Sequence, residues 1–214
     1  MIEPLTIQRI EQKEAHCGPA TISMLFSFYC EFVAQEDVAR AAGMTDIIID
    51  AEGMRLDELH NGVRNLFPNG EYVLLAKYHA TIDDLAHLTN TIGLPAGIEW
   101  QGRFIYPDRT ERDQGHYSIV TGVDQDRGVL HVVDPEPQNL LTLNGELAIT
   151  SFEPRWWEMD IVPFPDQSDS RVIEMERLIF VVAAQDRVER LHALGYRPAN
   201  LALIWKHCVS LETR

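Results

Sequence analysis

Residues 12–33 read QKEAHCGPATISMLFSFYCEFV, and from Gly18 onward apolar side chains recur on nearly every side of a helix. A helix that is apolar almost all round is buried inside a domain, so we expect 18–33 to lie in the core. Cys17 directly precedes this helix, where the positive end of the helix dipole favours a thiolate. Pro19 loses no hydrogen bond in a first turn, and Gly18 leaves the backbone beside the thiol open. The stretch predicts a buried helix that begins with either a nucleophile or a small buried thiol.

We predict that the other two cysteines, Cys30 and Cys208, are structural. Cys30 follows Cys17 by 13 positions, which turns it on a helix by about 220°. If Cys17 faces a cleft, Cys30 is therefore expected to be buried in the core. The chain has no Cys-x-x-Cys pair, so the cysteines indicate neither a zinc knuckle nor a disulfide framework.

The composition limits the class of protein. The chain has 214 residues, 45% of them hydrophobic, which fits one globular domain with or without an appendage. Its 33 acidic and 18 basic residues give a net charge of −15. Such a surface repels nucleic acids and anionic membranes, and it mildly favours a neutral or basic substrate. We see neither a secretion signal nor a membrane span, and we expect a cytoplasmic protein with reduced thiols.

The order of the predicted elements indicates an α+β fold, with helices first and mostly antiparallel strands later. We expect further helices at 35–42, 56–66, 81–88 and 186–194, and strands at 72–76, 96–100, 116–123, 129–133 and 178–183. Residues 101–115 are rich in charge and are expected to form a loop. Thr81, with Asp84 three residues on, is expected to cap its helix.

A predicted hairpin supplies a base for the thiol. If the turn between 116–123 and 129–133 centres on Gln125, His116 stands opposite Asp134, with Cβ atoms about 5 Å apart. A carboxylate beside an imidazole raises its pKa and fixes its tautomer. A bulge or a shifted turn would move the pairing by one or two residues, and those registers remain open. Strand alternation places His131 on the other face from Asp134.

A side-chain amide upstream of Cys17 could complete a site for acyl chemistry. Gln12 precedes Cys17 by five residues, close enough for its amide and the Cys17 N–H to form an oxyanion hole. Gln8 is the rival for this role, and either glutamine is otherwise a solvated loop residue. The histidines show no metal-ligand spacing, so we expect neither a metal nor a cofactor.

Two further groups have alternative interpretations. Arg103, Arg109 and Arg112 either bind an acidic substrate or are solvated in the charged loop. Trp156 and Trp157 either line a cleft or fill the core, and we expect the core because large aromatic side chains are usually buried.

Three segments together resemble papain-like cysteine peptidases of the bacteriocin-processing (double-glycine peptidase) type. They are residues 12–20 with Met24 following, residues 115–124 (GHYSIVTGVD) and residues 132–135 (VVDP), in the order of that family. The resemblance covers about residues 8–160. It implies a papain-like fold, in which a buried N-terminal nucleophile helix packs on an antiparallel sheet.

The resemblance also implies a role for each candidate residue. Cys17 would be the nucleophile, His116 the base and acid, Asp134 the residue that orients His116, and Gln12 the oxyanion donor. The best-known members are fused to membrane transporters and cut after Gly-Gly, a substrate that this chain, with no membrane segment, does not support.

The sequence therefore predicts a cysteine-dependent hydrolase of amide or peptide bonds that acts on a peptide or protein. The alternatives are a catalytically inactive peptide-binding module of the same fold, and a thiol acyl-transferase or deamidase. We expect residues 1–164 to form the peptidase-like domain. Residues 165–214 are expected to add a strand and a helix that pack on it.

Overall fold

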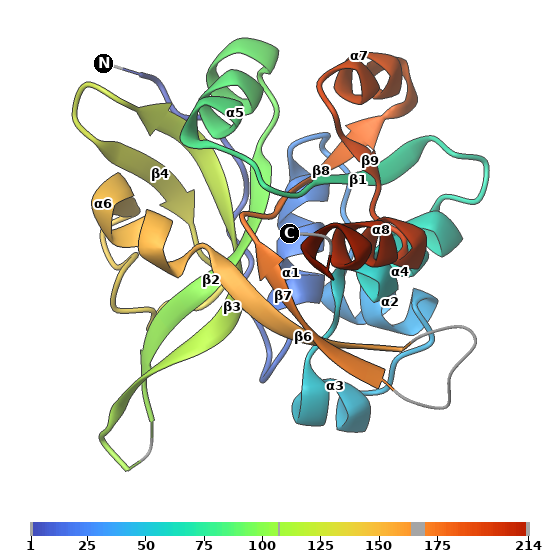
Figure 1. Cartoon of the computed structure of the whole chain (residues 1–214), viewed down its shortest axis with the longest axis horizontal. Coiled ribbons are helices and arrows are strands. Elements are labelled where there is room, and N and C mark those ends of the chain that lie inside the picture. The colour runs from blue at the N-terminus through green and yellow to red at the C-terminus, as the bar shows by residue number, and fades with distance from the viewer. Residues whose placement is uncertain (1, 107, 164–169, 213–214) are drawn as a thin grey trace.

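The computed structural model describes residues 2–106, 108–163 and 170–212. Figure 1 shows helices α2, α3 and α4 gathered on one side, the strands β2, β3 and β4 on the other, and α1 between them. The α-helices are α1 (Cys17–Ser27), α2 (Gln35–Ala41), α3 (Asp46–Glu52), α4 (Leu56–Leu66), α5 (Ile82–Ala86), α6 (Ile149–Phe152), α7 (Val188–Ala193) and α8 (Leu201–Glu212). The strands are β1 (Tyr72–Lys77), β2 (Ala96–Ile105), β3 (Glu111–Asp124), β4 (Val129–Val133), β5 (Glu146–Ala148), β6 (Trp157–Pro163), β7 (Ser170–Glu176), β8 (Ile179–Ala184) and β9 (Arg197–Pro198). Short helical turns are η1 (His87–Ile92), η2 (Glu153–Arg155) and η3 (Gln185–Arg187).

Seven of the described strands form one antiparallel sheet in the order β5-β4-β3-β2-β8-β1-β9. Strands β6 and β7 pair separately as a hairpin. Strand β8 lies between β2 and β1, so the C-terminal part of the chain supplies a central strand of the sheet. The predicted boundary between residues 164 and 165 falls outside the described residues. The predicted α+β arrangement with an antiparallel sheet is confirmed.

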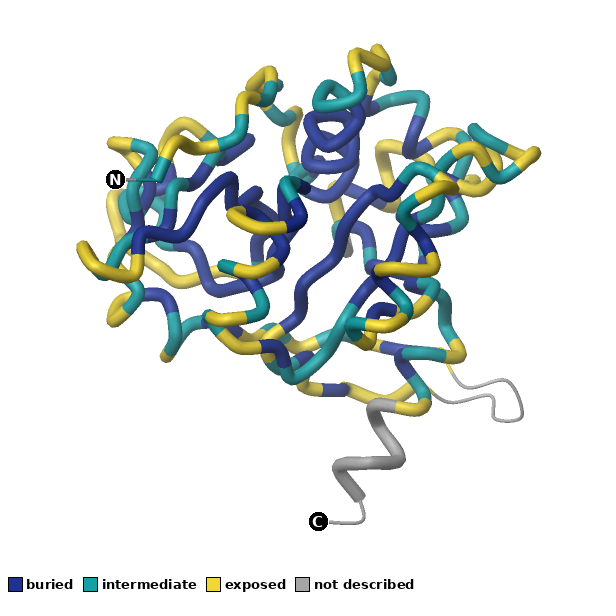
Figure 2. The backbone as a smooth tube through the Cα atoms, turned by 90° about the horizontal axis from the view of Figure 1, so that it is seen from above, coloured by how far each residue is buried: buried dark blue, intermediate teal, exposed yellow. Residues whose placement is uncertain are grey.

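Both faces of this sheet are buried, and Figure 2 shows long dark blue stretches of backbone in the interior of the molecule. On one face Phe180 and Val182 of β8 pack with α1, α2 and α4. On the other face Ile179 and Val181 pack with α5, α6 and α7. Because successive strand residues point to opposite faces, burial on both faces requires the continuous apolar run of β8, IFVVA.

Helix α1 is buried from Gly18 to Phe26, as the sequence predicts, but it ends at Ser27 rather than at 33. The Ser27 hydroxyl donates to the Met24 carbonyl (2.6 Å) and accepts from the Gln8 N–H (2.9 Å). Such local side-chain bonds compete with helix continuation. Cys30 then takes a left-handed conformation (φ 59°) and is exposed. The prediction of a buried Cys30 is wrong because the helix on which it relied has already ended.

The charged segment 101–115 is not the loop that its composition indicates. Strands β2 and β3 extend through it and pair as far as Ile105 opposite Glu111. Arg103 and its cross-strand partner Asp113 form an ion pair (3.1 Å). The charged side chains therefore lie on a two-stranded ribbon that is exposed to solvent, and the backbone N–H and C=O groups of this ribbon are paired in the ladder.

Helix α4 and strand β4 have the predicted bounds, and Thr81 and Asp84 form the predicted capping box. Trp156 is buried and its indole donates to the Leu178 carbonyl (3.1 Å), as expected for the core. Trp157 is 37% exposed, so the core prediction is wrong for it. The side chain of Cys208 lies outside the described part of the chain. No helix among the described residues is long and apolar enough to cross a bilayer.

Candidate active site

Cys17 is the first residue of α1, and its half-buried side chain faces an open cavity of 410 Å³. As the first helical residue it has a backbone N–H without a partner inside the helix. Gly18 lets this end of α1 approach its neighbours, because a Cβ there would lie 3.1 Å from Leu59 and 3.4 Å from Tyr117. The sequence thus sets a thiol at the dipole end of a buried helix and at the edge of a cleft.

His116 of β3 lies between Cys17 and Asp134. Its buried ring donates through Nε2 to Asp134 Oδ1 (2.7 Å), so Nδ1 is the nitrogen left to face Cys17. The edge of the ring packs on Phe104, with centroids 5.1 Å apart. Burial favours the neutral ring, but the charge and hydrogen bond of Asp134, with a contribution from the Cys17 thiol, raise the pKa of His116 to about 10. The geometry therefore favours an imidazolium at neutral pH.

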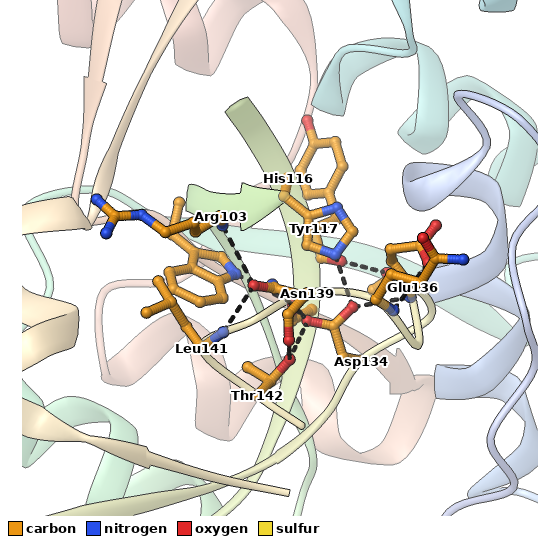
Figure 3. A network of polar contacts seen from close by, with 12 residues as sticks. Arg103, His116, Tyr117, Asp134, Glu136, Asn139, Leu141 and Thr142 are labelled. Atoms are coloured by element: carbon orange, nitrogen blue, oxygen red, sulfur yellow. Dashed lines mark hydrogen bonds and ion pairs between the residues drawn. The ribbon is translucent and has the colours of Figure 1, made fainter. Parts of the chain in front are cut away.

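Asp134 follows the end of β4 and accepts hydrogen bonds on both oxygens (Figure 3). Besides His116, its Oδ1 accepts from the Glu136 N–H (2.8 Å). Its Oδ2 accepts from Ser118 Oγ (3.0 Å), Asn139 Nδ2 (2.9 Å) and Thr142 Oγ1 (2.9 Å). Burial opposes ionisation, yet the charge of His116 and these bonds hold the pKa of Asp134 below its usual value. A carboxylate with so many donors stays ionised and fixed in direction.

The residues that hold Asp134 in place were not predicted from the sequence. Ser118 shares the face of His116 on β3, and its hydroxyl in turn accepts from the Trp100 indole (3.0 Å). Asn139 and Thr142 come from the loop after β4. The signal that could have found Ser118 is its position two residues after His116, because alternate strand residues share a face.

The N-terminal segment is attached to the same loop, which places Gln12. The Arg9 side chain donates to the Asp134 carbonyl (2.8 Å), and the Gln12 N–H donates to the Pro135 carbonyl (3.1 Å). The Gln12 side chain lines the cavity with Cys17 and His116, and its buried Oε1 has no hydrogen-bond partner. Gln8 is exposed and its backbone bonds to Ser27, at the far end of α1. The structure therefore brings Gln12, and not Gln8, to the thiol.

Of the three arginines proposed as an alternative anion site, Arg103 and Arg112 are paired with carboxylates. Arg103 contacts Asp113, and Arg112 contacts Asp108. Within the described ranges, no group of three or more His, Cys, Asp or Glu side chains is arranged to hold a metal ion.

Comparisons with known proteins agree with this architecture. The family model described as the Peptidase C39-like family matches residues 4–161, whereas no curated protein matches the chain. The chain is similar to the crystal structure of a double-glycine-motif protease from an AMS/PCAT transporter in complex with the leader peptide. That similarity has a TM-score of 0.52 at 13% identity and covers 85% of this chain and 94% of the other. The peptidase domain of Streptococcus ComA, a bi-functional ABC transporter involved in quorum sensing, matches with a TM-score of 0.46 at 14% identity, over 85% of this chain and 99% of that domain.

At such low identity the first of these structures shows a shared fold, which is the papain-like fold expected from the three sequence segments. The family match spans most of the chain and includes the helix that begins at Cys17, the strand that carries His116 and the loop of Asp134. The chain belongs to the Peptidase C39-like family.

Proposed function

We propose that this protein is a cysteine peptidase that uses Cys17, His116 and Asp134 to hydrolyse peptide bonds. The observation that carries the proposal is the buried His116 ring, hydrogen-bonded to Asp134 on one side and facing Cys17 on the other. A thiolate at a helix N-terminus, paired with an imidazolium that a carboxylate orients, is an activated nucleophile. The solved relative in complex with a leader peptide supports a peptide as the substrate.

The reaction follows from the positions of these groups. The Cys17 thiolate attacks the carbonyl carbon of the substrate, and the oxyanion that forms accepts from the Cys17 N–H and from the Gln12 side-chain amide. His116 then gives its proton to the leaving amine, and the C–N bond breaks to leave a thioester on Cys17. Water, deprotonated by His116, attacks the thioester and releases the acid and the thiol. Because this chemistry needs a reduced thiol, we place the activity in the cytoplasm.

The test is alkylation by limiting iodoacetamide from about pH 5 to about pH 9, with peptide mapping of each cysteine. We expect Cys17 to react fast already near pH 6, whereas the exposed Cys30 of the same molecule reacts as an ordinary thiol. His116→Ala is expected to abolish this advantage. His131→Ala, which removes a histidine of the same β3–β4 hairpin outside the cavity, is expected to leave it unchanged.

The second half of the test is turnover. Cys17→Ala is expected to abolish cleavage of peptides that the wild type cuts in a peptide library. If Cys17 reacts no faster than Cys30 at any pH and no peptide is cut, the peptidase proposal is wrong. A protein that still binds peptides would then be a binding module of this fold.

A further inference from the structure

A second cavity, of 280 Å³, also opens at Cys17 and His116, and Gln12 does not line it. Four carboxylates that the proposed reaction does not use line it: Asp50 of α3, which lines the first cavity as well, Glu99 of β2, and Glu158 and Asp160 of β6. Tyr117, the residue after His116, lines it too and stands opposite Glu99 in the β2–β3 ladder. Any substrate held at Cys17 therefore lies next to a cluster of acids.

Strand alternation in β6 turns these acids inward. Glu158 and Asp160 are half-buried, whereas Met159 and Ile161 between and after them are 47% and 62% exposed. A strand at a protein surface normally points its apolar side chains inward and its charged ones to solvent. In this inverted pattern two apolar side chains stay exposed and lose the stabilisation that burial would give them. Stability of the fold therefore does not explain why the carboxylates point inward.

The position of Glu158 is held by its surroundings. Its Oε2 accepts from Gln101 Nε2 (2.6 Å) and its Oε1 from the Met159 N–H (2.9 Å). It occupies the space that a side chain at residue 115 would need, because a Cβ on Gly115 would overlap the Glu158 carboxylate. Glycine directly before His116 thus allows a carboxylate to lie beside the candidate catalytic ring.

Among the described lining residues, few donors and little positive charge face this cluster of acids. Glu99 is only 3% exposed, and its Oε2 accepts no hydrogen bond within 3.5 Å. The buried Tyr117 hydroxyl makes none within that distance either, and it interacts with the Glu99 carboxylate only at longer range. Apart from His116, the only basic side chain among the described lining residues is Arg55. Arg55 forms ion pairs with Asp57 (3.0 Å) and Glu58 (2.9 Å), and its charge partly offsets the raised pKa of Asp160. A buried acceptor without a donor costs free energy that a ligand bringing donors and positive charge would recover.

Without a bound cation, burial and mutual repulsion make these acids hold their protons more tightly than usual. Burial, with the charge of Asp160 added, raises the pKa of Glu99 well above its usual value. Burial and the charge of Glu158 raise the pKa of Asp160 to about 7, and burial also raises the pKa of Glu158. The described side chains offer no arrangement of three or more ligands for a metal ion. An organic cation with N–H donors suits the cavity better.

We propose that this acidic cavity, lined by Glu99, Glu158 and Asp160, binds a lysine or arginine side chain of the substrate beside the bond to be cut. The inference deepens the proposed peptidase function and rests on it. An ammonium or guanidinium group would donate to the free Glu99 Oε2 and to the carboxylate of Asp160. The cavity would thereby select basic peptides by a residue near the scissile bond.

The first test reads the charge beside Cys17 without any cleavage. Cys17 is modified by two methanethiosulfonates of similar size, one carrying trimethylammonium and one carrying sulfonate, and the ratio of their rate constants is compared with the ratio at Cys30. We expect the cationic reagent to be favoured at Cys17 by about tenfold more than at Cys30. Glu158→Gln and Asp160→Asn are expected to lower the ratio at Cys17 and not at Cys30. Glu174→Gln, on the exposed face of the paired strand β7, is the matched control and should change neither ratio.

The second test reads recognition of the side chain. Peptide pairs that differ in one residue, arginine against citrulline or lysine against norleucine, are placed at each position flanking the cut bond. We expect the cationic member to have about tenfold higher kcat/KM at one position in the wild type and in Glu174→Gln. That preference should fall in Glu158→Gln and in Asp160→Asn. The same pairs are titrated against Cys17→Ala, which measures binding alone.

The outcomes separate the two proposals. If peptides are cut but the members of each pair are equivalent at every position, the acidic cavity has no such role and the peptidase proposal stands. If nothing is cut but Cys17→Ala prefers the arginine peptides, and Asp160→Asn removes that preference, the recognition stands and the peptidase proposal fails. A reagent ratio at Cys17 equal to that at Cys30 would overturn the inference on its own.

Discussion

His116 and Asp134 are diagonal neighbours in the β3–β4 ladder rather than directly opposed. The ladder pairs Ile119 with Val133, and continuing this register places Asp134 opposite Ser118, two residues from His116. Because the offset is two, His116 and Ser118 share a face, and both donate to the same carboxylate (2.7 and 3.0 Å). One aspartate thus orients the imidazole while its second oxygen is held by a neighbour of that imidazole.

Asp134→Asn is expected to lower kcat/KM by about 10²- to 10⁴-fold, as loss of an orienting carboxylate does in catalytic triads. All five hydrogen-bond partners of its two oxygens are donors, so an amide N–H₂ there must face another donor. The same substitution should cost about 1–3 kcal/mol of unfolding free energy. Kinetic assays and denaturant titration measure both quantities.

Thr142→Val provides the graded comparison, because it removes one of three donors to Oδ2 and keeps the carboxylate. We expect it to lower kcat/KM by less than about tenfold and to leave the protein folded. If Asp134→Asn is as active as Thr142→Val, Asp134 supports the fold and not the reaction.

The His116–Asp134 pair also predicts a pH window for stability. The pKa of His116 is raised from 6.5 to about 10, so its contribution is complete below about pH 6.5 and is lost as the pH rises towards 10. The pKa of Asp134 lies below 3.8, so its contribution is present above that pH and is lost as the pH falls through the lowered value. The difference in unfolding free energy between wild type and His116→Gln should therefore be largest between about pH 4 and pH 6.5 and shrink towards pH 10. A difference in unfolding free energy that stays constant from about pH 4 to about pH 10 would contradict the pairing.

The sequence predicted which residues share a face of the β3–β4 hairpin, but it did not predict the register in which the two strands pair. Alternation correctly put His116 and Asp134 on one face, but Asp124 pairs with Val129, so the turn centres between Asp126 and Arg127 and not on Gln125. A bulge at Thr121, between Val120 and Gly122, then shifts the ladder by one residue. A bulge depends on tertiary packing, so the composition of the two strands does not encode it visibly. The end of α1 at Ser27 was missed for a related reason, since it depends on contacts with the N-terminal segment.

The acidic cavity could not be predicted from spacing at all. Glu99 and Glu158 are 59 positions apart, and they meet only because the β6–β7 hairpin packs against β2. In the sequence, Glu158 and Asp160 have the alternation of a surface strand with charged residues towards solvent. Only the fold reverses that interpretation, because it shows which side of β6 faces the cleft.

Gln12→Ala is expected to lower kcat by about 10²- to 10³-fold with little change in KM, because an oxyanion donor acts in the transition state. The backbone bond of Gln12 to Pro135 does not involve the side chain, so the segment should keep its position. Gln8→Ala is the matched control and should retain wild-type kcat. If kcat of Gln12→Ala equals that of Gln8→Ala, the second oxyanion donor is another group in the cavity.

Asp160→Asn is expected to stabilise the protein at alkaline pH. The pKa of Asp160 rises from 3.8 in the unfolded chain to about 7 in the fold, so the folded state holds the extra proton between these values. Unfolding free energy contributed by this group therefore falls as the pH rises from about 4 to about 7 and stays reduced above. Asparagine carries no charge to bury, so the Asp160→Asn variant does not lose this unfolding free energy as the pH rises. Because Asp160 is only half-buried and solvent screens its charge, we expect a gain of about 1–2 kcal/mol at pH 8 and none near pH 4.

Thermal unfolding of the two proteins at these pH values measures the gain, which corresponds to a midpoint shift of about 2–4 °C per kcal/mol for a chain of this size. Asp126→Asn, in the exposed turn between β3 and β4, makes the same chemical change without burial and should shift the midpoint little at either pH. A destabilised Asp160→Asn at pH 8 would mean that Arg55 depends on this carboxylate for its own stabilisation. A gain in stability together with lost preference for basic peptides would instead show that the carboxylate is kept for binding at a cost to the fold.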